Sequence, residues 1–417
     1  MKLSQSTENN EICPEVLMSC GLDEIVRKGA QKMLQAALEY EVEQFIETYK
    51  MLKDEKGNRL AVRNGYMPDR NITTPAGKVN IKQPRIDDRK LKSKHDIQYS
   101  SQILPKYLRK SPNMNNLIPM LYLKGISTND FPAALSAILG KGAEGLSPST
   151  ISRLKESWED DYKKWQKKDL TNKRYVYFWA DGIYLKARLQ DAKKCVLVII
   201  GVTDKGRKEL VAVYDGYRES KISWKEVLLD LRNRGLDKGP ELSIGDGALG
   251  FWAALEEIYP ECKRQRCWVH KTANILDKLP KSVQPNAKSM LHEMYLAPTV
   301  EDAEKAYETF IELYEDKYPK AVKCLTGDKD DLFTFYSFPA KHWQSIRTTN
   351  PIESTFATVR LRTAKTRNCY TEKTVLTMVF KLLAEAGKKW RKLRGFKEII
   401  LVINRGVFVN GELKKAS

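Results

Sequence analysis

The chain has 417 residues, of which 42% are hydrophobic and 30% are charged, so it is long enough for two or three domains with real cores. Its 72 Lys and Arg outnumber its 53 Asp and Glu, which gives a net charge of +19. No apolar run approaches the ~20 residues that span a bilayer, the N-terminus lacks an apolar signal core, and the seven cysteines are scattered. We therefore expect a reduced, cytoplasmic protein with no membrane partner, and neither a membrane protein nor a disulfide-rich secreted one.

The positive charge is concentrated in two segments. Residues 51–110 hold 15 basic and 6 acidic residues, and residues 341–400 hold 14 and 4, so their net charges of +9 and +10 equal the excess of the whole chain. Such localisation favours a polyanionic partner, nucleic acid before a membrane surface. A merely solvated basic surface is the alternative at this point.

The first region, residues 1–110, is predicted to be helical and then to form a basic hairpin. Residues 21–50 repeat apolar side chains at helical spacing, as one long helix or two short ones. In residues 63–86 a Pro-Ala-Gly-Lys turn precedes the alternating pair Val79 and Ile81, which indicates a small hairpin.

The second region, residues 111–172, is predicted to be helical, with Ser127 and Ser147 as N-caps on either side of the link "GKGAEG". Two helices joined in this way resemble a helix-turn-helix, in which Arg153 and Lys155 of the second helix could face DNA. An ordinary helical hairpin fits the same pattern.

From residue 173 the chain changes to short apolar runs with tight turns. The runs "YVYFWADGIYLKAR", "KCVLVIIGVTD" and "KELVAVYDGYR" predict an antiparallel meander, and the order up to residue 270 is β-β-β-α-β-α-β, with "CKRQRCWVH" as the last strand. Residues 271–345 read as nearly all helix. Residues 346–417 are predicted to complete the core with basic helices. The fold class is therefore α+β or α/β, with a helical insertion.

Two aspartates, each followed by glycine, end two of these strands. Asp181 ends the first strand and Asp246 follows the fourth, and in this order of elements the fourth strand can lie parallel beside the first. The two carboxylates would then repel each other unless they share a proton or bind cations. Hard oxygen ligands favour Mg²⁺ or Mn²⁺, and the glycines could leave room for a phosphate backbone.

A third carboxylate is needed to complete such a site. Glu353 is favoured by its context, "SIRTTNPIESTFATVRLRTAKTRN", which places one acid in the first turn of a helix among bases that could clamp a phosphate backbone. The other candidates are Asp215, Glu256 and Glu257. Any one of these acids alone is more often a turn or cap residue.

The chain resembles the bacterial insertion-sequence transposases of the Mutator-related family, whose members carry a DDE triad on an RNase H-like fold. The matching pieces, in order, are "ADGIYLKAR", "IGDGALGFWAALEEIYP", "RQRCWVHKTANIL" and "FPAKHWQSIRTTNPIEST". The resemblance covers residues ~60–390. It implies that Asp181, Asp246 and Glu353 are the metal-binding catalytic residues, with Mg²⁺ or substituting Mn²⁺, as two ions. The spacing of 107 residues from Asp246 to Glu353 would include the helical insertion.

The pair Cys267 and His270 matches the family's C-x-x-H element. Its spacing also suggests zinc, but a zinc site needs about four ligands and only His292 and Cys262 are plausible additions. A structural role near the active site is favoured. Trp343 is an open case, since it could stack on an unpaired base or belong to the core.

The favoured function is that of a DNA transposase, which would hydrolyse a phosphodiester at an element end and transfer the strand to target DNA. Terminal inverted repeats and target DNA would be its partners, pairing of two ends implies a homodimer, and the protein would act at the nucleoid. A non-catalytic, transposase-derived DNA-binding protein is the alternative, and a plain nuclease explains less of the chain. The expected DNA contacts are Lys78, Lys82, Arg153, Lys155, Trp343, Arg347, Arg360 and Arg362.

Overall fold

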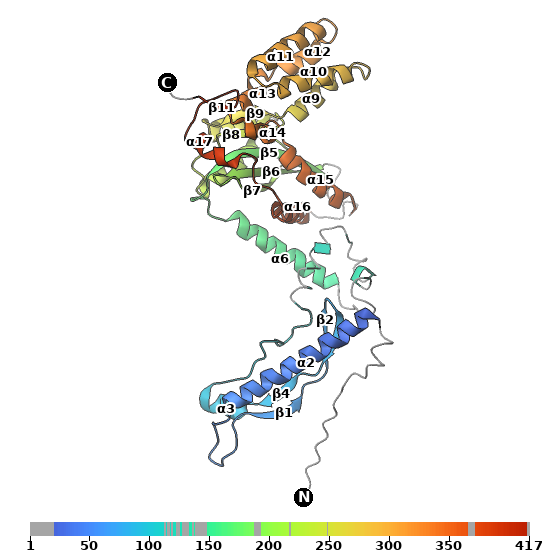
Figure 1. Cartoon of the computed structure of the whole chain (residues 1–417), viewed down its shortest axis with the longest axis vertical. Coiled ribbons are helices and arrows are strands. Elements are labelled where there is room, and N and C mark those ends of the chain that lie inside the picture. The colour runs from blue at the N-terminus through green and yellow to red at the C-terminus, as the bar shows by residue number, and fades with distance from the viewer. Residues whose placement is uncertain are drawn as a thin grey trace. The chain divides into compact units, whose positions relative to one another are not determined.

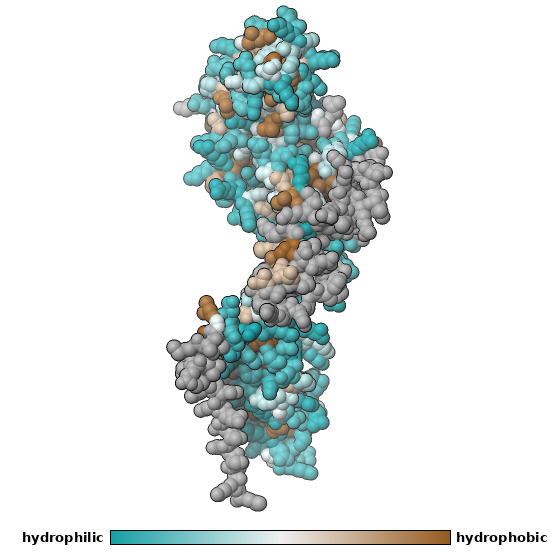
Figure 2. Space-filling view, turned by 90° about the vertical axis from the view of Figure 1, so that its right-hand side faces the viewer, coloured by the Kyte–Doolittle hydropathy of each residue, from teal (hydrophilic) through white to brown (hydrophobic). Residues whose placement is uncertain are grey.

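The computed structural model describes residues 21–111, 148–186, 193–216, 218–247, 249–365 and 372–414, with a few isolated positions between 112 and 147. The chain divides into two compact units, Met1–Ile151 and Ser152–Ser417 (Figure 1). On the face drawn in Figure 2, hydrophilic side chains predominate and hydrophobic ones are scattered. No helix in the described part of the chain has the length and apolar character needed to cross a membrane.

The first unit is a long helix packed on two small antiparallel strand pairs. Residues 21–50 form one helix, α2 (Leu22–Thr48), and the predicted hairpin is β2 (Arg70–Thr74) with β3 (Gly77–Ile81). As the alternation predicts, Val79 and Ile81 are buried beneath α2 whereas Lys78 and Lys82 are exposed. Three further elements complete the unit: β1 (Val62–Tyr66), β4 (Pro84–Asp87) and α3 (Arg89–His95).

The predicted second helix of residues 111–172 is α6 (Pro148–Gln166). Its stripe of aromatic residues packs into the second unit: Tyr162 donates a hydrogen bond to the Val213 carbonyl at 2.7 Å, and the Trp165 ring lies 4.9 Å from that of Phe380. The predicted first helix, with its Ser127 cap, and the Ser147 cap fall outside the described residues, so the helix-turn-helix stays a prediction.

The second unit is built on a five-stranded mixed sheet of order β7-β6-β5-β8-β9. The predicted meander is confirmed, because β5 (Tyr175–Lys186) pairs antiparallel with β6 (Lys193–Thr203), which pairs antiparallel with β7 (Lys208–Gly216). The predicted parallel neighbour of the first strand is also confirmed, as β8 (Leu242–Gly245) runs parallel to β5. The sheet ends with β9 (Lys263–Arg266), parallel to β8.

Helices cover both faces of this sheet (Figure 1). On one face α7 (Lys221–Asn233) and α8 (Leu249–Ile258) bury their apolar sides together with Phe178 and Ala180 of β5. Because side chains alternate along a strand, Tyr177, Trp179 and Asp181 point to the other face. There Tyr177 bonds His342 and Trp179 donates to the Ser345 carbonyl. The helix α15 (Asn350–Lys365) packs against β5, and α16 (Glu372–Gly387) packs against β7.

Residues 271–345 are mostly helical, as the sequence predicts, although the helices begin earlier than expected. The run "CKRQRCWVH" is a strand only as far as Arg266, and the predicted strand over Cys267–His270 is wrong. The Trp268 N–H turns away from the sheet to the Arg347 carbonyl at 3.1 Å, and a helix starts there. The insertion comprises α9 (Trp268–Leu276), α10 (Gln284–Leu296), α11 (Val300–Tyr314), α12 (Pro319–Thr326) and α13 (Lys329–Leu332).

Short elements lead from the insertion into α15 and close the chain. Before α15 lie η1 (Thr334–Ser337), η2 (Ala340–His342) and α14 (Trp343–Ile346). After α16 come η3 (Phe396–Glu398), α17 (Ile399–Ile403) and the pair β10 (Phe408–Val409) with β11 (Glu412–Leu413). The predicted Asn410-Gly411 turn joins the last two strands, with φ of 50° and 80°.

Candidate active site

The strand register brings the two predicted aspartates together. Trp179 of β5 pairs with Ile244 of β8, and Asp181 and Asp246 each follow two residues later. Because the two strands are parallel, the same offset carries both acids to one edge of the sheet. The adjacency expected from the order of elements is therefore present, and a carboxylate oxygen of each acid lies within 4.8 Å of the other.

A residue that the sequence analysis missed, Glu219, joins this pair. It follows β7 and comes directly before Ser220, the N-cap of α7, whose Oγ accepts a hydrogen bond from Ser223 N. One oxygen from each of Asp181, Glu219 and Asp246 lies within 4.8 Å of the others. The only signal in the sequence was an acid immediately before a helix cap.

The two glycines after the aspartates make room for protein side chains. A Cβ at Gly182 would lie 2.5 Å from Glu219 Oε1, and a Cβ at Gly247 would lie 1.3 Å from Arg266 Nη1. The expectation that these glycines admit a phosphate backbone is therefore corrected, because a carboxylate and a guanidinium occupy the space beside them. Gly247 also has φ +87°, a conformation that L side chains rarely adopt.

Burial and mutual repulsion act on this cluster. Asp181 is only 5% exposed, and burial, followed by the charges of Asp246 and Glu353, raises its pKa to about 8. Burial and the charge of Asp246 raise the pKa of Glu219 to about 7. These groups therefore gain from either a proton or a cation placed among them.

The hydrogen bonds of the cluster leave two oxygens for a ligand. Gly182 N donates to Asp181 Oδ1 at 2.8 Å. Asp181 Oδ2 and Glu219 Oε2 are buried and have no hydrogen-bond partner among the described residues. Oxygen-only donors with buried, unpaired carboxylate oxygens fit a hard divalent cation such as Mg²⁺ or Mn²⁺.

Glu353 faces the same site from the first turn of α15 but has cationic partners of its own. His270 Nε2 lies 3.3 Å from its Oε1, and Arg360 Nη1 donates to its Oε2 at 3.2 Å. The hydrogen bond from His270 is the largest cause that lowers the pKa of Glu353 to about 2. Glu353 is thus held ionised beside Asp181.

The two residues of the C-x-x-H element, Cys267 and His270, help to position Glu353. Thr349, just before α15, donates from N and Oγ1 to Cys267 Sγ, each at 3.2 Å. Burial raises the pKa of Cys267, but hydrogen bonds from His270 and Thr349 outweigh it and lower that pKa overall. Bonds to Cys267 and Glu353 raise the pKa of His270 to about 10. Cys267 and His270 therefore tie the start of α9 to the start of α15.

The zinc alternative finds no support in the part of the chain that the structure describes. Among the described residues, one group of three or more His, Cys, Asp or Glu side chains is close enough to share an ion, and it consists of Asp181, Glu219 and Asp246. Cys262 instead bonds Ser243 and the Lys263 carbonyl, and the His292 ring packs on Tyr295.

The predicted DNA contacts lie in different settings. Trp343 is half-buried, packs its ring edgewise on Phe335 and Tyr336, and donates to the Phe338 carbonyl at 2.8 Å. Arg347 donates to the Tyr295 carbonyl at 2.7 Å and lies over that ring, whereas Arg362 is only 3% exposed. The exposed members are Lys78, Lys82, Arg153 and Arg360, and Lys155 is half-buried.

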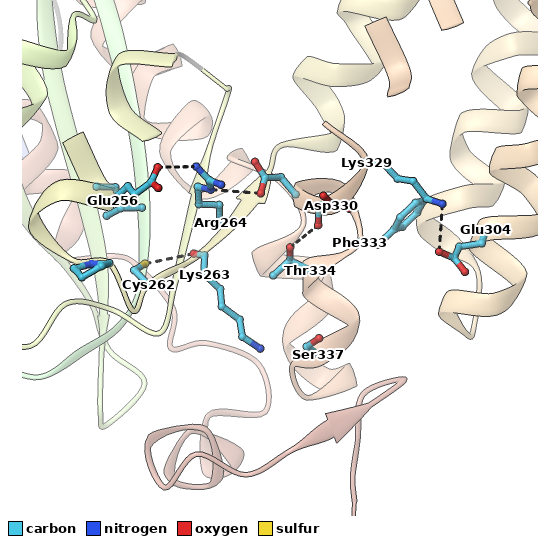
Figure 3. Close-up of a pocket in the computed structure, with 13 residues that line it drawn as sticks. Glu256, Cys262, Lys263, Arg264, Glu304, Lys329, Asp330, Phe333, Thr334 and Ser337 are labelled. Carbon is cyan, nitrogen blue, oxygen red and sulfur yellow. Dashed lines mark hydrogen bonds and ion pairs between the residues drawn. The ribbon is translucent and has the colours of Figure 1, made fainter. Parts of the chain in front are cut away.

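A pocket of 570 Å³ lies elsewhere in the second unit (Figure 3). It is lined by residues of α8, α11, α13 and η1 and by the start of β9, whereas Asp181 lies within β5 and Asp246 follows β8. Several of its charges are paired: Arg264 lies 3.5 Å from both Glu256 and Asp331, and Lys329 lies 3.6 Å from Glu304. Two of the residues considered as site candidates, Glu256 and Cys262, line this pocket, whereas Asp181, Asp246 and Glu353 do not.

Comparison of the amino-acid sequence with known proteins gives one consistent answer. The family described as "Transposase, Mutator family" matches residues 1–393. The chain is 49% identical to the transposase for insertion sequence element IS6120 of Mycolicibacterium smegmatis, over 72% of this chain and 92% of that protein. It is also 49% identical to the transposase for insertion sequence element IST2 of Acidithiobacillus ferrooxidans, over 67% and 94%. Among solved structures, the Drosophila P element transposase strand transfer complex aligns over 77% of this chain and 86% of that one, with 8% identity and a TM-score of 0.28.

Proposed function

Because the chain belongs to the Mutator family of transposases, we propose that it cleaves DNA at the ends of an insertion sequence and transfers the strands to a target by a DDE mechanism. The observation that carries the proposal is the approach of Asp181 and Asp246, from two separate elements, to within 4.8 Å of each other, with Glu353 near enough for its charge to raise the pKa of Asp181. Both steps are in-line displacements at phosphorus, which such a carboxylate site can serve.

We infer that the sheet is an RNase H-like core. An antiparallel meander that continues into two parallel strands, in the order β7-β6-β5-β8-β9, supports the inference. Asp181 lies within β5, which continues beyond it to Lys186, so the expectation that it ends this strand is corrected; Asp246 follows β8, Glu353 lies in the first turn of α15, and the helical insertion separates the last two of these acids.

The chain's own residues orient the groups that would hold metal. Asp181, Asp246 and Glu353 would bind Mg²⁺, or Mn²⁺ in its place, as two ions. Such ions, when bound, activate a water or a DNA 3′-hydroxyl and stabilise the leaving oxygen. Gly182 N fixes one oxygen of Asp181, while His270 and Arg360 hold the two oxygens of Glu353.

DNA is the proposed partner of both basic segments. Exposed Lys78 and Lys82 on the first unit would neutralise phosphates of the terminal inverted repeats, and Arg153 and Lys155 on α6 would read or position them. Near the site, Arg360 would contact the cleaved strand. Trp343, Arg347 and Arg362 are the other proposed DNA-binding residues of this region. Action on two ends at the nucleoid in the cytoplasm would require at least a homodimer.

The alternative is a transposase-derived protein that only binds DNA. Buried carboxylate oxygens without a hydrogen-bond partner disfavour it, because such oxygens lower stability and serve no purpose in DNA binding. The same arrangement is what metal-dependent chemistry needs.

Cleavage of a labelled duplex that carries the element end tests the proposal. Wild type should cut in Mg²⁺ or Mn²⁺, lose activity in EDTA and regain it with added Mg²⁺, while Ca²⁺ should support binding with little cleavage. Asp246→Asn should bind the end but not cut, whereas the exposed Asp316→Asn should behave as wild type. Cutting by Asp246→Asn at the wild-type rate, or full activity in EDTA, would refute the mechanism.

A further inference from the structure

We propose that Glu219 is a fourth carboxylate of this site: with Asp181 and Asp246 it holds one divalent cation, while Glu353 and Asp181 hold the other. This inference rests on the proposed metal-dependent function and extends the set of three acids on which that function was based. It divides the four acids into two ligand sets that share Asp181.

The distances favour this division. Oxygens of Asp181, Glu219 and Asp246 all approach within 4.8 Å of one another, which places the three around one position. Glu353 has a different neighbourhood, because its two oxygens are engaged by His270 and Arg360. Its closest link to the cluster is through Asp181.

A second observation points to a ligand among the first three acids. Asp181 is only 5% exposed, and its Oδ2 is buried with no partner, as is Glu219 Oε2. Each of these two buried carboxylate oxygens is unfavourable without a donor, and a cation placed among the three acids would satisfy both. Oxygen donors without nitrogen or sulfur indicate Mg²⁺ or Mn²⁺ rather than zinc.

Glu219 is also placed by packing rather than left on a loose loop. Its backbone runs against α8 at Gly250, where a Cβ would lie 2.4 Å from the Glu219 carbonyl oxygen. Its carboxylate lies against Gly182, where a Cβ would lie 2.5 Å from Oε1. Two glycines on different elements thus create the space in which this side chain reaches Asp181.

The competing explanation is a structural acid pair, in which Glu219 and Asp181 share a proton and no ion binds. The two explanations differ in how the Gln variant responds to metal. A shared proton predicts that Mn²⁺ binding is unaffected by Glu219→Gln, whereas a ligand role predicts a loss.

Mn²⁺ binding to the full-length protein without DNA is the direct test, measured by the electron paramagnetic resonance of free Mn²⁺ and by the rise in melting temperature on adding Mn²⁺. We expect Glu219→Gln to weaken one Mn²⁺ site by at least about tenfold and to remove most of the rise. Glu226→Gln, an exposed acid on the adjacent helix α7, is the matched control and should bind as wild type. If Glu219→Gln is poorly folded, Glu219→Asp keeps the charge, shortens the reach by one methylene and should weaken the same site.

Catalysis supplies a second readout. Glu219→Gln should need a higher Mg²⁺ concentration for half-maximal cleavage and should recover as Mg²⁺ is raised, unlike Asp246→Asn. Mn²⁺ binding by Glu219→Gln with wild-type affinity and stoichiometry, while Asp246→Asn loses it, would overturn the role of Glu219 alone. A wild-type protein that cleaves without binding Mn²⁺ would overturn both this inference and the function beneath it.

Discussion

Glu41 in the first unit and Asp181 in the second are both acids on regular elements within folded cores, but their surroundings are opposite. Glu41, on α2, accepts hydrogen bonds from the side chains of Tyr99 and Ser101 and from the backbone of Gln102 and Ile103. These four donors fasten the segment after α3 onto the long helix. The carboxylate is fully used in holding the unit together.

Asp181 has other acids where Glu41 has donors. Apart from the N–H of Gly182, its charged neighbours are the acids Glu219, Asp246 and Glu353 and, with the opposite effect on its pKa, His270, and one of its oxygens is buried without a partner. The same chemical group therefore stabilises one unit and weakens the other. An acid surrounded by donors serves structure, and an acid surrounded by acids retains binding capacity for a ligand.

The largest expected effect comes from removing the charge of Asp181. Asp181→Asn should lower the cleavage rate on the order of 10³-fold or more, since several kcal/mol of transition-state stabilisation depend on the metal site. In EDTA it should melt at the same or a higher temperature than wild type, because a repelling charge is gone. Single-turnover cleavage and thermal melting in EDTA measure both. Clear destabilisation in EDTA would mean that Asp181 is a structural acid like Glu41.

Removing Glu41 should have the opposite result. Glu41→Ala should lower the unfolding free energy of the first unit by about 2–4 kcal/mol, because four donors lose a charged acceptor. All eight tryptophans lie in the second unit, so tryptophan fluorescence reports that unit alone. The urea concentration at the midpoint of unfolding should therefore fall when unfolding is followed by hydrogen exchange of α2. It should stay unchanged when unfolding is followed by tryptophan fluorescence. The exposed Glu43→Ala is the control, with a change within about 0.5 kcal/mol.

The exposed bases should affect DNA affinity by smaller amounts. Arg153→Ala should reduce discrimination between element-end and scrambled DNA by about 1–3 kcal/mol if it reads a base edge. Lys78→Ala should weaken both DNAs alike and reduce the salt dependence by about one phosphate contact. Gel shifts at two salt concentrations compare them with Lys305→Ala, an exposed base on α11. Unchanged discrimination by Arg153→Ala would leave α6 as a packing helix only.

The smallest effect is a pH dependence from His342. This ring is buried, and it hydrogen-bonds with the Tyr177 hydroxyl through Nδ1 and with the Gly395 carbonyl through Nε2. Burial lowers the pKa of His342, and Lys341 adds to that shift whereas Glu398 opposes it. The unfolded chain then binds a proton more readily, so this contribution to stability is complete above pH ~6.5 and is lost as pH falls through the lowered pKa. The difference in unfolding free energy between wild type and His342→Gln, measured by fluorescence, should therefore narrow from pH 8 to pH 5. A gap that widens on acidification would contradict the assigned burial.

Much of this protein follows from local pattern. Alternating or continuous apolar residues predict the hairpin around Val79 and Ile81, the meander and the parallel fourth strand, because side-chain periodicity reflects which face is buried. The adjacency of Asp181 and Asp246 also follows, since parallel neighbouring strands carry residues at equal offsets to the same edge. The resemblance to the Mutator family, confirmed by comparison, depends on the same short motifs.

What the tertiary structure alone decided is which distant groups meet. Glu219, the guanidinium of Arg266 beside Gly247, and the hold of His270 on Glu353 have no periodic or local signal, because each contact joins segments tens of residues apart through the packing of loops and helix ends. Local sequence also did not predict that the last strand ends at Arg266, because the turn of Trp268 toward Arg347 depends on a segment ~80 residues later in the chain. Periodicity reports burial of a face, whereas a site depends on the positions of single atoms in space.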